Sequence, residues 1–423
     1  MDTLYFLVSA SALSFALSLR KRFAIIRESF TLPSRAHVTS LFVYPVKGCR
    51  AVSVSSCEIT CTGLAFDRHW MIVSLDDEAP HLGRFVSQRE CSRLAVIDAT
   101  VFINGKENGE KCTSCFTTAS SEDRVILRLS APSMNPLDVP LIRESTRRVS
   151  IWKSTLTAFD QGDDVSEWLR DALSEFSSDS IPFDSSRLRL VYTDGMSRKS
   201  TKESTESISS RPSRLLSSSF LPFGSLWIGT YLIQAHDSVS FADGYPVLLT
   251  SAASLRDLNH RIVTRAVSLK NEERNVRDPF IGIEHPMNRF RSNIVCDGRD
   301  LVPWEEDSWL TFAVRRQHTP LSSDSSDTMC PLIMRGLKRC ARCMVTTTDQ
   351  NTGFRGTGDC EAREPLASLS TFRKSFDVNG GIMFGINVLF EWQEIKERKF
   401  RSERVISVGD NIVVIKRGKM PLE

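Results

Sequence analysis

Short β-prone segments separated by turns fill much of the first half of this 423-residue chain, and they constrain its fold more than any other feature. Many short strands with turn residues between them are typical of a β-barrel or a sandwich. We therefore expect a mixed α+β protein that is mostly β. The β-prone segments are 38–46, 52–59, 70–75, 94–102 and 125–129.

Two later segments have the periodicity of helices instead. Apolar residues recur at helical spacing between 163 and 176, after two aspartates that suit a helix start. A second helix is expected over 251–262, with Ser251 as its candidate N-cap. The chain ends in a strand–turn–strand pattern over 405–415, in which Gly409 and the following Asp supply the turn.

The N-terminus is apolar and uncharged from Thr3 to Leu19, and a basic cluster follows at 20–22. About 17 residues at about 1.5 Å each just span the apolar core of a bilayer. Positive charge after the apolar run keeps the body of a protein on the cytosolic side. We expect a single membrane-anchor helix or targeting segment at 1–22 and a linker at 23–37; a cleaved targeting segment is the alternative.

Composition excludes some classes of function. The chain has 54 Lys and Arg against 51 Asp and Glu, a net charge of +3 that does not indicate a nucleic-acid partner. Its 11 cysteines are odd in number and irregularly spaced, which indicates a reducing compartment rather than a disulfide framework. The stretches 194–220 and 319–328 are rich in Ser and charge, and are expected to be surface segments.

The segment Cys340-Ala-Arg-Cys343 is the sharpest chemical motif. A guanidinium lowers the pKa of a nearby thiol, and the thiolate is a nucleophile or a metal ligand. Three interpretations stay open: a redox pair, half of a zinc site with Cys112 and Cys115, or a single thiolate on a transition metal. The stretch 345–348 is β-prone, which does not favour the helix that follows a thioredoxin-type pair.

Several basic residues stand at the ends of expected strands, at Lys47-Gly48, at Asp67-Arg68 and between Arg289 and Asn293. Each alone is more often a solvated charge than a ligand. Together with a thiolate they could bind an anionic cofactor, since Arg is the bidentate partner of phosphate. The acidic runs 76–78 and 305–307 are expected to be turns or surface. The sequence contains no P-loop, GxGxxG or HxxxH motif.

Taken in order, these segments resemble the MOSC family, in which a MOSC N-terminal β-barrel domain precedes a MOSC β-barrel domain. The resemblance covers most of residues 38–416; each motif is weak alone, but their shared order is highly specific. The matching segments are LFVYPVKG (41–48), GLAFDRHWM (63–71), RFVSQRE (84–90), FADGYP (241–246), RFRSNIV (289–295), PWEEDSW (303–309), CARC (340–343), TTTD (346–349), TG (352–353), FGIN (384–387) and VGD (408–410).

The resemblance implies a MOSC N-terminal domain at 38–180, a Ser/Arg-rich linker and insertion at 181–240, and a MOSC domain at 241–418. The inserts at 194–240 and 319–330 depart from compact members. The similarity is greatest to the membrane-anchored, amidoxime-reducing branch of the family. That branch implies an oxidoreductase with a Mo-molybdopterin cofactor, and it makes Cys343 both the catalytic residue and the metal ligand, whereas Cys340 is not a ligand.

The same branch implies small N-hydroxylated substrates and electrons from NADH through cytochrome b5 reductase and cytochrome b5. It also implies the mitochondrial outer membrane, with the endoplasmic reticulum as the alternative. At the level of the whole family, pyridoxal phosphate binding is a further expectation. The rival function is a sulfur carrier or a protein that binds and transfers the molybdenum cofactor, as in cofactor sulfurases; the lack of room for a lyase domain before residue 38 favours the reductase.

By resemblance, Lys47 and Arg68 would hold the pterin phosphate. Arg291 and Arg342 would line the cofactor, where a buried dianion needs cationic and hydrogen-bonding partners. Arg342 would also stabilise the thiolate of Cys343. The remaining positions implied as cofactor-binding are Gly48, Gly244, Tyr245, Asn293, Ala341 and Asn387.

Four positions depart from the family pattern. Gly244 and Tyr245 stand where the animal members carry small hydroxyl residues, and Asn387 stands where they carry Tyr. Ser292 replaces the usual Pro after Arg291. The side-chain contacts of the cofactor are therefore expected to differ at these places.

Overall fold

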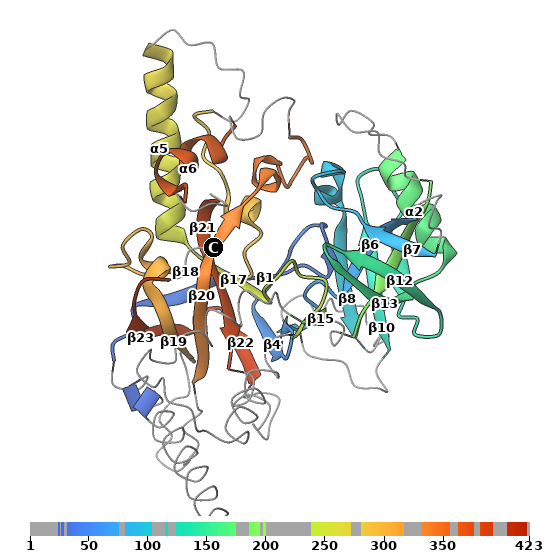
Figure 1. Cartoon of the computed structure of the whole chain (residues 1–423), viewed down its shortest axis with the longest axis horizontal. Coiled ribbons are helices and arrows are strands. Elements are labelled where there is room, and N and C mark those ends of the chain that lie inside the picture. Colours follow the sequence, from blue (N-terminus) through green and yellow to red (C-terminus); the bar gives the residue numbers. More distant parts are fainter. Residues whose placement is uncertain are drawn as a thin grey trace, which may run out of the picture.

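The computed structural model describes residues 24–25, 27–28, 32–75, 81–103, 115–116, 124–174, 186–194, 198–199, 238–271, 281–316, 331–355, 363–375, 381–391 and 404–420. The described residues form two lobes that lie side by side, and each is built mainly of strands (Figure 1). The expectation of a mostly β protein with barrels is thus confirmed.

The larger lobe is built on an eight-stranded sheet. Its strand order is β18-β17-β21-β20-β19-β23-β1-β3, and β18 also pairs with β1, which closes the sheet into a barrel. The strands are β1 (Ala36–Val43), β3 (Val52–Val54), β17 (Val247–Ser251), β18 (Ile294–Asp297), β19 (Trp309–Arg315), β20 (Leu332–Arg342), β21 (Ile382–Phe390) and β23 (Asn411–Arg417).

The smaller lobe contains a second closed sheet, with the order β14-β13-β12-β7-β6-β2 and an additional pairing of β14 with β6. Along β13 the buried side chains alternate with exposed or half-buried ones, as the period of two in a strand requires. The strands are β2 (Val46–Lys47), β6 (Trp70–Leu75), β7 (Leu82–Phe85), β12 (Thr146–Ile151), β13 (Ser154–Asp160) and β14 (Leu188–Tyr192).

Smaller sheets and helices complete the described structure. The short strands are β4 (Ser56–Thr60), β5 (Gly63–Leu64), β8 (Asp98–Ile103), β9 (Cys115–Phe116), β10 (Val125–Ser130), β11 (Leu137–Pro140), β15 (Arg198–Lys199), β16 (Ser238–Val239) and β22 (Val405–Ser407). The helices are α2 (Asp163–Ser174), α5 (Ala252–Asn271) and α6 (Leu366–Arg373), with 3-10 turns η1 (Ser92–Val96), η2 (Met287–Phe290), η3 (Glu305–Ser308) and η4 (Met344–Thr347).

The two ends of the described chain meet in the larger lobe. β1 runs antiparallel to β18, with Leu41 opposite Ile294, and it also pairs with β23 through Ala36 and Ile412. The late strand β22 pairs with β4 from the first part of the chain. The strand that opens the region expected as the N-terminal domain is therefore hydrogen-bonded into the sheet of the C-terminal half.

Buried apolar side chains pack continuously across the junction of the two lobes. A single cluster of buried side chains runs from the β1 residues through Trp70 of β6 to Trp309 and Phe312 of β19. A separate cluster lies between α5, α6 and β21, where the rings of Phe290 and Phe384 stack with centroids 3.8 Å apart. Continuous apolar contact of this kind holds the junction of the lobes in a fixed geometry.

The two helices expected from periodicity are confirmed. α2 starts at Asp163, the acidic position that suited a helix start, and buries Val165, Trp168, Leu169 and Leu173. α5 starts directly after Ser251, whose Oγ accepts a hydrogen bond from the backbone N of Ser254 at 3.4 Å. This is the contact of an N-cap, although α5 continues well past residue 262.

Other predictions from the sequence are wrong in part, or concern residues outside the described part of the chain. The β-prone stretch 345–348 forms a 3-10 turn, η4, rather than a strand. The C-terminal turn at Gly409 and Asp410 is confirmed, but β22 and β23 pair with different strands instead of with each other. The anchor segment at 1–22, Cys112 and nearly all of the two inserts lie outside the described residues. Among the described helices, none combines the length and apolar character needed to cross a membrane.

Candidate functional site

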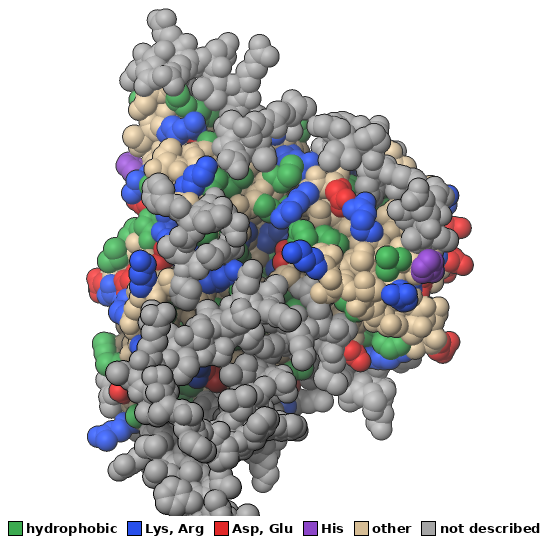
Figure 2. All heavy atoms as spheres, viewed as in Figure 1, with side chains coloured by type: hydrophobic (Ala, Val, Ile, Leu, Met, Phe, Trp, Pro, Cys, Tyr) green, Lys and Arg blue, Asp and Glu red, His purple; other side chains and the backbone are tan. Residues whose placement is uncertain are grey.

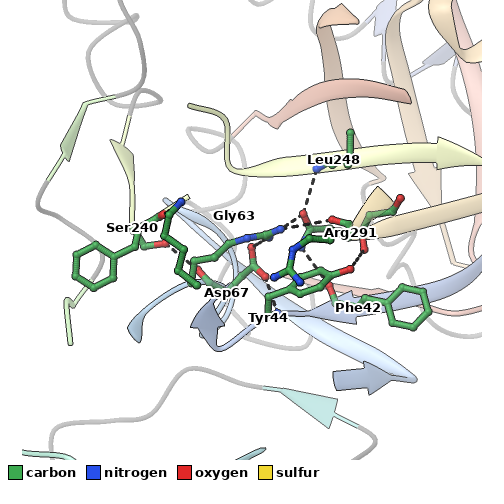
Figure 3. A network of polar contacts seen from close by, with 12 residues as sticks. Phe42, Tyr44, Gly63, Asp67, Ser240, Leu248 and Arg291 are labelled. Atoms are coloured by element: carbon green, nitrogen blue, oxygen red, sulfur yellow. Dashed lines mark hydrogen bonds and ion pairs between the residues drawn. The ribbon is translucent and has the colours of Figure 1, made fainter. Parts of the chain in front are cut away.

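A buried polar cluster lies between the lobes where β1 ends. Its centre is Tyr44, whose backbone N donates to Asp67 Oδ1 at 2.8 Å and whose hydroxyl donates to the Ser292 carbonyl at 3.2 Å. Tyr44 and Asp67 are each about 1% exposed. Figure 3 shows Tyr44, Asp67 and Arg291 close together, between the segments that carry Phe42 and Leu248. We call Tyr44, Asp67, Arg68, Arg291 and Asn293 the Tyr44 cluster.

Two arginines contact the Tyr44 ring. The guanidinium carbons of Arg68 and Arg291 lie 4.5 and 4.4 Å from its centroid, which is the range of cation–π contacts. Both residues have a left-handed backbone, with φ of 54° and 53°. This conformation is uncommon for a side chain that large and marks a local backbone constraint. The two guanidinium groups thus reach one ring from two different loops.

Asp67 and Asn293 hold Arg68 in place. Arg68 Nη1 forms an ion pair with Asp67 Oδ2 and donates to Asn293 Oδ1 at 3.1 Å. Asn293 is 1% exposed; its Oδ1 also accepts from the Leu248 backbone N at 3.1 Å, and its Nδ2 donates to the Phe42 carbonyl at 3.1 Å. Asn293 thus forms hydrogen bonds to β1, to the start of β17 and to Arg68. These protein groups occupy both of its polar side-chain atoms.

Burial sets the protonation of the cluster. It raises the pKa of Tyr44 to about 12, against the opposing effect of the nearby arginines, so the phenol stays neutral at physiological pH. Burial also raises the pKa of Asp67, although the Arg68 guanidinium and the Tyr44 backbone N–H favour the carboxylate. Burial lowers the pKa of Arg291, which remains a cation because guanidinium groups do not deprotonate in proteins.

Lys47 lies on β2, at the same junction. Its Nζ donates to the Phe241 carbonyl at 2.9 Å, forms an ion pair with Asp243 and lies 5.4 Å from the Phe85 ring centroid. Asp243 also accepts from Trp152 Nε1 at 3.1 Å. Desolvation opposes ionisation of Asp243, but Lys47 and Trp152 hold the pKa of that carboxyl well below its ordinary value.

The cysteine motif stands at the end of β20. Arg342 Nη1 contacts Cys340 Sγ at 3.0 Å, and Arg342 Nη2 donates to the Phe290 carbonyl at 2.6 Å. Cys343 begins η4, where its carbonyl accepts from Thr346 N at 3.1 Å. Both cysteines are free and partly exposed. The guanidinium therefore lies against the first thiol of the motif, whereas we expected it to stabilise Cys343.

Arg342 connects this motif to the Tyr44 cluster. Phe290, the acceptor of its hydrogen bond, belongs to η2 and directly precedes Arg291. Its charge also acts on the ionisation of Tyr44, together with Arg68 and Arg291. Three arginines from three parts of the sequence thus converge near one ring.

The other expected cofactor residues surround this arrangement. Gly48 has φ +89°, and a Cβ there would lie 3.0 Å from Leu94 Cδ1, so the turn after Lys47 requires glycine. Ala341 is exposed on β20, next to Arg342. Tyr245 lies beneath Lys338, whose Nζ is 5.2 Å from the ring centroid, and Gly244 precedes it. Asn387 stands opposite Lys338 and Leu248 in the sheet.

Several residues of this site were not singled out from the sequence. Tyr44, Asp67 and Asp243 lie inside matched motifs, but their role as partners of arginine and lysine depends on the tertiary structure. Trp152 lies in the turn between β12 and β13, with φ of 53°, and nothing in its sequence context marked it. Gln88 and Gln350 are also part of the site, as described below.

The acidic run at 305–307 was expected to be turn or surface; it forms the 3-10 turn η3, but one residue of that turn, Glu306, does not lie at the surface. Its side chain is fully buried, and both carboxyl oxygens accept from Ser254 Oγ, at 2.7 and 2.9 Å. Burial raises the pKa of Glu306 to about 7, against the hydrogen bond from Ser254. A single buried carboxyl flanked by charged neighbours could not be distinguished from an exposed one by composition.

The charge balance of the junction favours an anion. The junction brings together four cationic side chains, those of Lys47, Arg68, Arg291 and Arg342. In the described part of the chain, Asp243 forms an ion pair with Lys47 and Asp67 forms one with Arg68. The buried Nε of Arg342 has no hydrogen-bond acceptor in this part of the chain. Figure 2 shows Lys and Arg side chains gathered along the junction of the two lobes. The residues therefore fit a group that carries a phosphate and needs a soft thiolate ligand.

The zinc interpretation of the cysteines gains no support from the described residues, in which no group of three or more His, Cys, Asp or Glu side chains is placed to hold a metal ion. Cys112 lies outside that part of the chain.

Comparison with known proteins gives two matches to protein families. A model of the MOSC N-terminal beta barrel domain matches residues 35–175, and a model of the MOSC domain matches residues 236–413. Together they cover most of the chain. Neither match supports the expectation of pyridoxal phosphate binding.

Curated relatives agree with these matches. The chain is 26% identical to mitochondrial amidoxime-reducing component 1 of Mus musculus over 340 residues, 79% of this chain and 71% of the relative. It is 24% identical to the Homo sapiens protein of the same name over 382 residues, 89% of this chain and 82% of the relative. It is 22% identical to the molybdenum cofactor sulfurase of Arabidopsis thaliana over 371 residues, 88% of this chain but 35% of the relative.

Proposed function

Because this chain belongs to the MOSC family, with a MOSC N-terminal beta barrel domain followed by a MOSC domain, we propose that it is a molybdenum-cofactor-dependent oxidoreductase that reduces small N-hydroxylated compounds. The relatives named amidoxime-reducing components, which align over most of their own length, support this choice of reaction.

The convergence of Arg68, Arg291 and Arg342 near Tyr44, with Lys47 at the same junction, is the observation that carries the proposal. A phosphate dianion removed from water requires cationic hydrogen-bond donors that are already in position. Asp67 and Asn293 hold the guanidinium of Arg68, and Gln350 accepts a hydrogen bond from that of Arg291, so both groups are positioned before any ligand binds. The site is therefore suited to hold the phosphate of a pterin cofactor.

Each residue then has a defined part in binding. Lys47 and Arg68 would bind the phosphate, with the backbone of Gly48 at the turn that follows Lys47. Arg291 and Arg342 would line the cofactor, together with the backbone of Ala341. Cys343, partly exposed at the end of β20, would supply the thiolate ligand.

When bound, the molybdenum cofactor supplies the two-electron redox chemistry, and the protein supplies binding, orientation and a ligand that tunes the metal. The contribution of Arg342 differs from our first expectation. Its guanidinium contacts the sulfur of Cys340, the cysteine that is not the proposed metal ligand.

The positions that depart from the family pattern shape the edge of the site. Tyr245, just before β17, lies under Lys338 of β20, and Asn387 of β21 stands opposite the same lysine. Gly244 directly precedes Tyr245. They would contact the cofactor or limit access to it. Asn293 is directed at the backbone of β1 and β17, so we assign it to holding Arg68 rather than to direct contact.

A second function is supported by one observation, the match to molybdenum cofactor sulfurases. A sulfur carrier, or a protein that binds and transfers the cofactor, would use the same basic cluster and the same cysteine, but it would hold the cofactor without turning over an N-hydroxylated substrate.

The electron donors and location follow from the proposed reaction. We propose NADH as the source, with cytochrome b5 reductase and cytochrome b5 as carriers. The names of the relatives favour mitochondria, with the outer membrane as the proposed site and the endoplasmic reticulum as the alternative.

Metal analysis of the full chain, purified from a host that makes the cofactor, tests the proposal. We expect near-stoichiometric molybdenum in the wild type and its loss in Cys343→Ser, while Cys340→Ser, a matched change at the same motif, retains the metal. Reduction of an amidoxime with NADH and the two cytochrome b5 components should follow the same order.

Other results would decide against it. Zinc, or no metal, in the wild type would end the molybdenum proposal and return the cysteines to the redox or zinc interpretations. Full molybdenum without any amidoxime reduction would favour the binding and transfer function.

A further inference from the structure

Two buried glutamines from different lobes face each other beside the Tyr44 cluster. Gln88 follows β7 in the smaller lobe, and Gln350 follows η4 in the larger lobe. They are 2% and 4% exposed. Gln88 Nε2 donates to Gln350 Oε1 at 3.1 Å, and Gln350 Nε2 donates to Gln88 Oε1 at 3.0 Å. The two amides therefore form a reciprocal pair across the junction.

Every amide N–H of the pair is used. The second N–H of Gln88 is directed to the Gly48 carbonyl at 2.6 Å, and that of Gln350 to the Thr348 carbonyl at 3.3 Å. A primary amide has two donors, so neither side chain has one left over. A buried network in which every donor is satisfied specifies a single arrangement, because any shift leaves a polar group unpaired.

Each glutamine also contacts a residue of the proposed cofactor site. Gln88 holds the carbonyl of Gly48, in the turn that carries Lys47. Gln350 Oε1 accepts from Arg291 Nη1 at 3.2 Å. The chain of contacts Gly48–Gln88–Gln350–Arg291 thus connects the lysine turn of one lobe to an arginine of the other.

The neighbouring contacts between these segments do not make this connection. Arg50 Nη2 donates to the Asn351 carbonyl at 3.0 Å, and Ser92 Oγ donates to the Gly353 carbonyl at 2.6 Å. Both dock the loop after η4 on the smaller lobe through backbone acceptors. They support the fold of the junction, whereas the amide pair reaches the site residues themselves.

We propose that Gln88 and Gln350 are positioning residues, which set the separation and orientation of the Gly48 turn and the Arg291 guanidinium and thereby determine how tightly the site holds an anionic phosphate. The inference rests on the proposed function for the identity of that anion. The geometry of the pair itself is independent of it.

Replacement by methionine, which keeps the length of the side chain and removes its polar atoms, tests the role of the pair. Three variants of the full chain are needed: Gln88→Met, Gln350→Met and the double variant. Gln161→Met is the matched control. Gln161 is also a buried glutamine, 3% exposed, but it bonds within the smaller lobe, to the backbone of Ile142 and Phe159.

Two quantities are measured for each protein: the midpoint of thermal unfolding, and the affinity for inorganic phosphate by calorimetry on protein freed of cofactor. Molybdenum content after expression is a third readout. We expect each single variant of the pair to weaken phosphate binding about tenfold, which is the size expected for losing one well-placed hydrogen-bonding partner. Gln161→Met should lower the unfolding midpoint and leave phosphate affinity unchanged.

The double variant separates positioning from stability. Each single change leaves one glutamine facing an apolar group, so removing both should restore part of the lost stability. The affinity for phosphate should not recover, because neither Gly48 nor Arg291 regains its partner. Recovery of stability without recovery of affinity is the signature of a positioning role.

Opposite outcomes point to different failures. If Gln88→Met and Gln350→Met lower the unfolding midpoint as the control does but keep wild-type phosphate affinity and molybdenum content, the positioning role is refuted and the proposed function survives. If the wild type binds neither phosphate nor molybdenum, the proposed function fails and the positioning role fails with it.

Discussion

Replacing Arg68 by methionine removes the guanidinium that faces the carboxylate of Asp67. Asp67 is 1% exposed, and without Arg68 it keeps as donors the backbone N of Tyr44, at 2.8 Å, and the side chain of Asn293. Breaking a buried ion pair by deleting one partner leaves an uncompensated charge, and this costs about 3–5 kcal/mol. We expect a loss of that size in the free energy of unfolding at neutral pH, far more than an exposed ion pair would give.

The dependence of this loss on pH follows from the pKa of Asp67. Burial already raises that pKa, and the Arg68 guanidinium opposes the shift. Without Arg68 the folded-state pKa rises further above the unfolded value, so the folded variant binds a proton more tightly than the unfolded chain. Its stability is then lost as pH rises from the ordinary range of Asp through the new pKa. The deficit relative to wild type should be small near pH 4 and largest near pH 7.

Urea unfolding of wild type and Arg68→Met at several pH values measures the effect. Arg147→Met is the matched control: Arg147 Nε also pairs with a buried aspartate, Asp160, at 2.7 Å, but Arg189 pairs with the same carboxylate at 2.5 Å and remains. The control should lose about 1 kcal/mol or less. A loss in Arg68→Met no larger than in the control, or a deficit that does not change with pH, would refute the reasoning.

Two further predictions concern Glu306 and Gly48. Burial raises the folded-state pKa of Glu306 to about 7, so stability from its protonated form is present below the ordinary Glu range and is lost as pH rises from about 4.5 to about 7. Over that window the wild type should lose about 3 kcal/mol relative to Glu306→Gln in urea unfolding, and parallel curves would contradict the assignment. Gly48→Ala should cost about 1–2 kcal/mol and weaken phosphate binding, because φ is +89° and the new Cβ would press on Leu94. Gly162→Ala, at φ +100° with an ordinary contact, should lose stability in the same unfolding assay but keep phosphate affinity in calorimetry; equal affinity in both variants would contradict a special role for Gly48.

Local structure could be predicted well from the sequence. The bounds of β6 agree with the expected segment 70–75, and α2 begins at the expected Asp163. Periodicity and capping residues act over a few residues, so a short window contains the needed information. The stretch 345–348 is the counterexample: its β-branched residues favour a strand, but β20 ends at Arg342 and the chain turns after it, with Cys343 as the N-cap of η4.

Tertiary partners could not be predicted in the same way. The pairing of β1 with β18 and β23 joins residues more than two hundred positions apart, and no local pattern specifies it. For the same reason Arg342 was assigned to Cys343, although its hydrogen-bonded neighbour is Cys340. The resemblance to a family placed Lys47, Arg68, Arg291 and Arg342 in one site, but it gave no information on the side chains that hold them.

The side chains that hold these cations give them different roles in anion binding. Asp67 is buried beneath Arg68 and cannot move to solvent without breaking the Tyr44 cluster, so Arg68 keeps its carboxylate when it meets an anion. Asp243 is different, since 71% of its side chain is exposed and its carboxylate can stay in contact with water when Lys47 turns to another anion. Lys47 can therefore exchange its carboxylate for a phosphate oxygen. Arg68 keeps its present partners and can only take a phosphate oxygen as an additional one. Its guanidinium has five N–H groups, which provide the donors for this. On this argument Lys47 supplies most of the charge neutralisation for the phosphate, and Arg68 supplies its orientation.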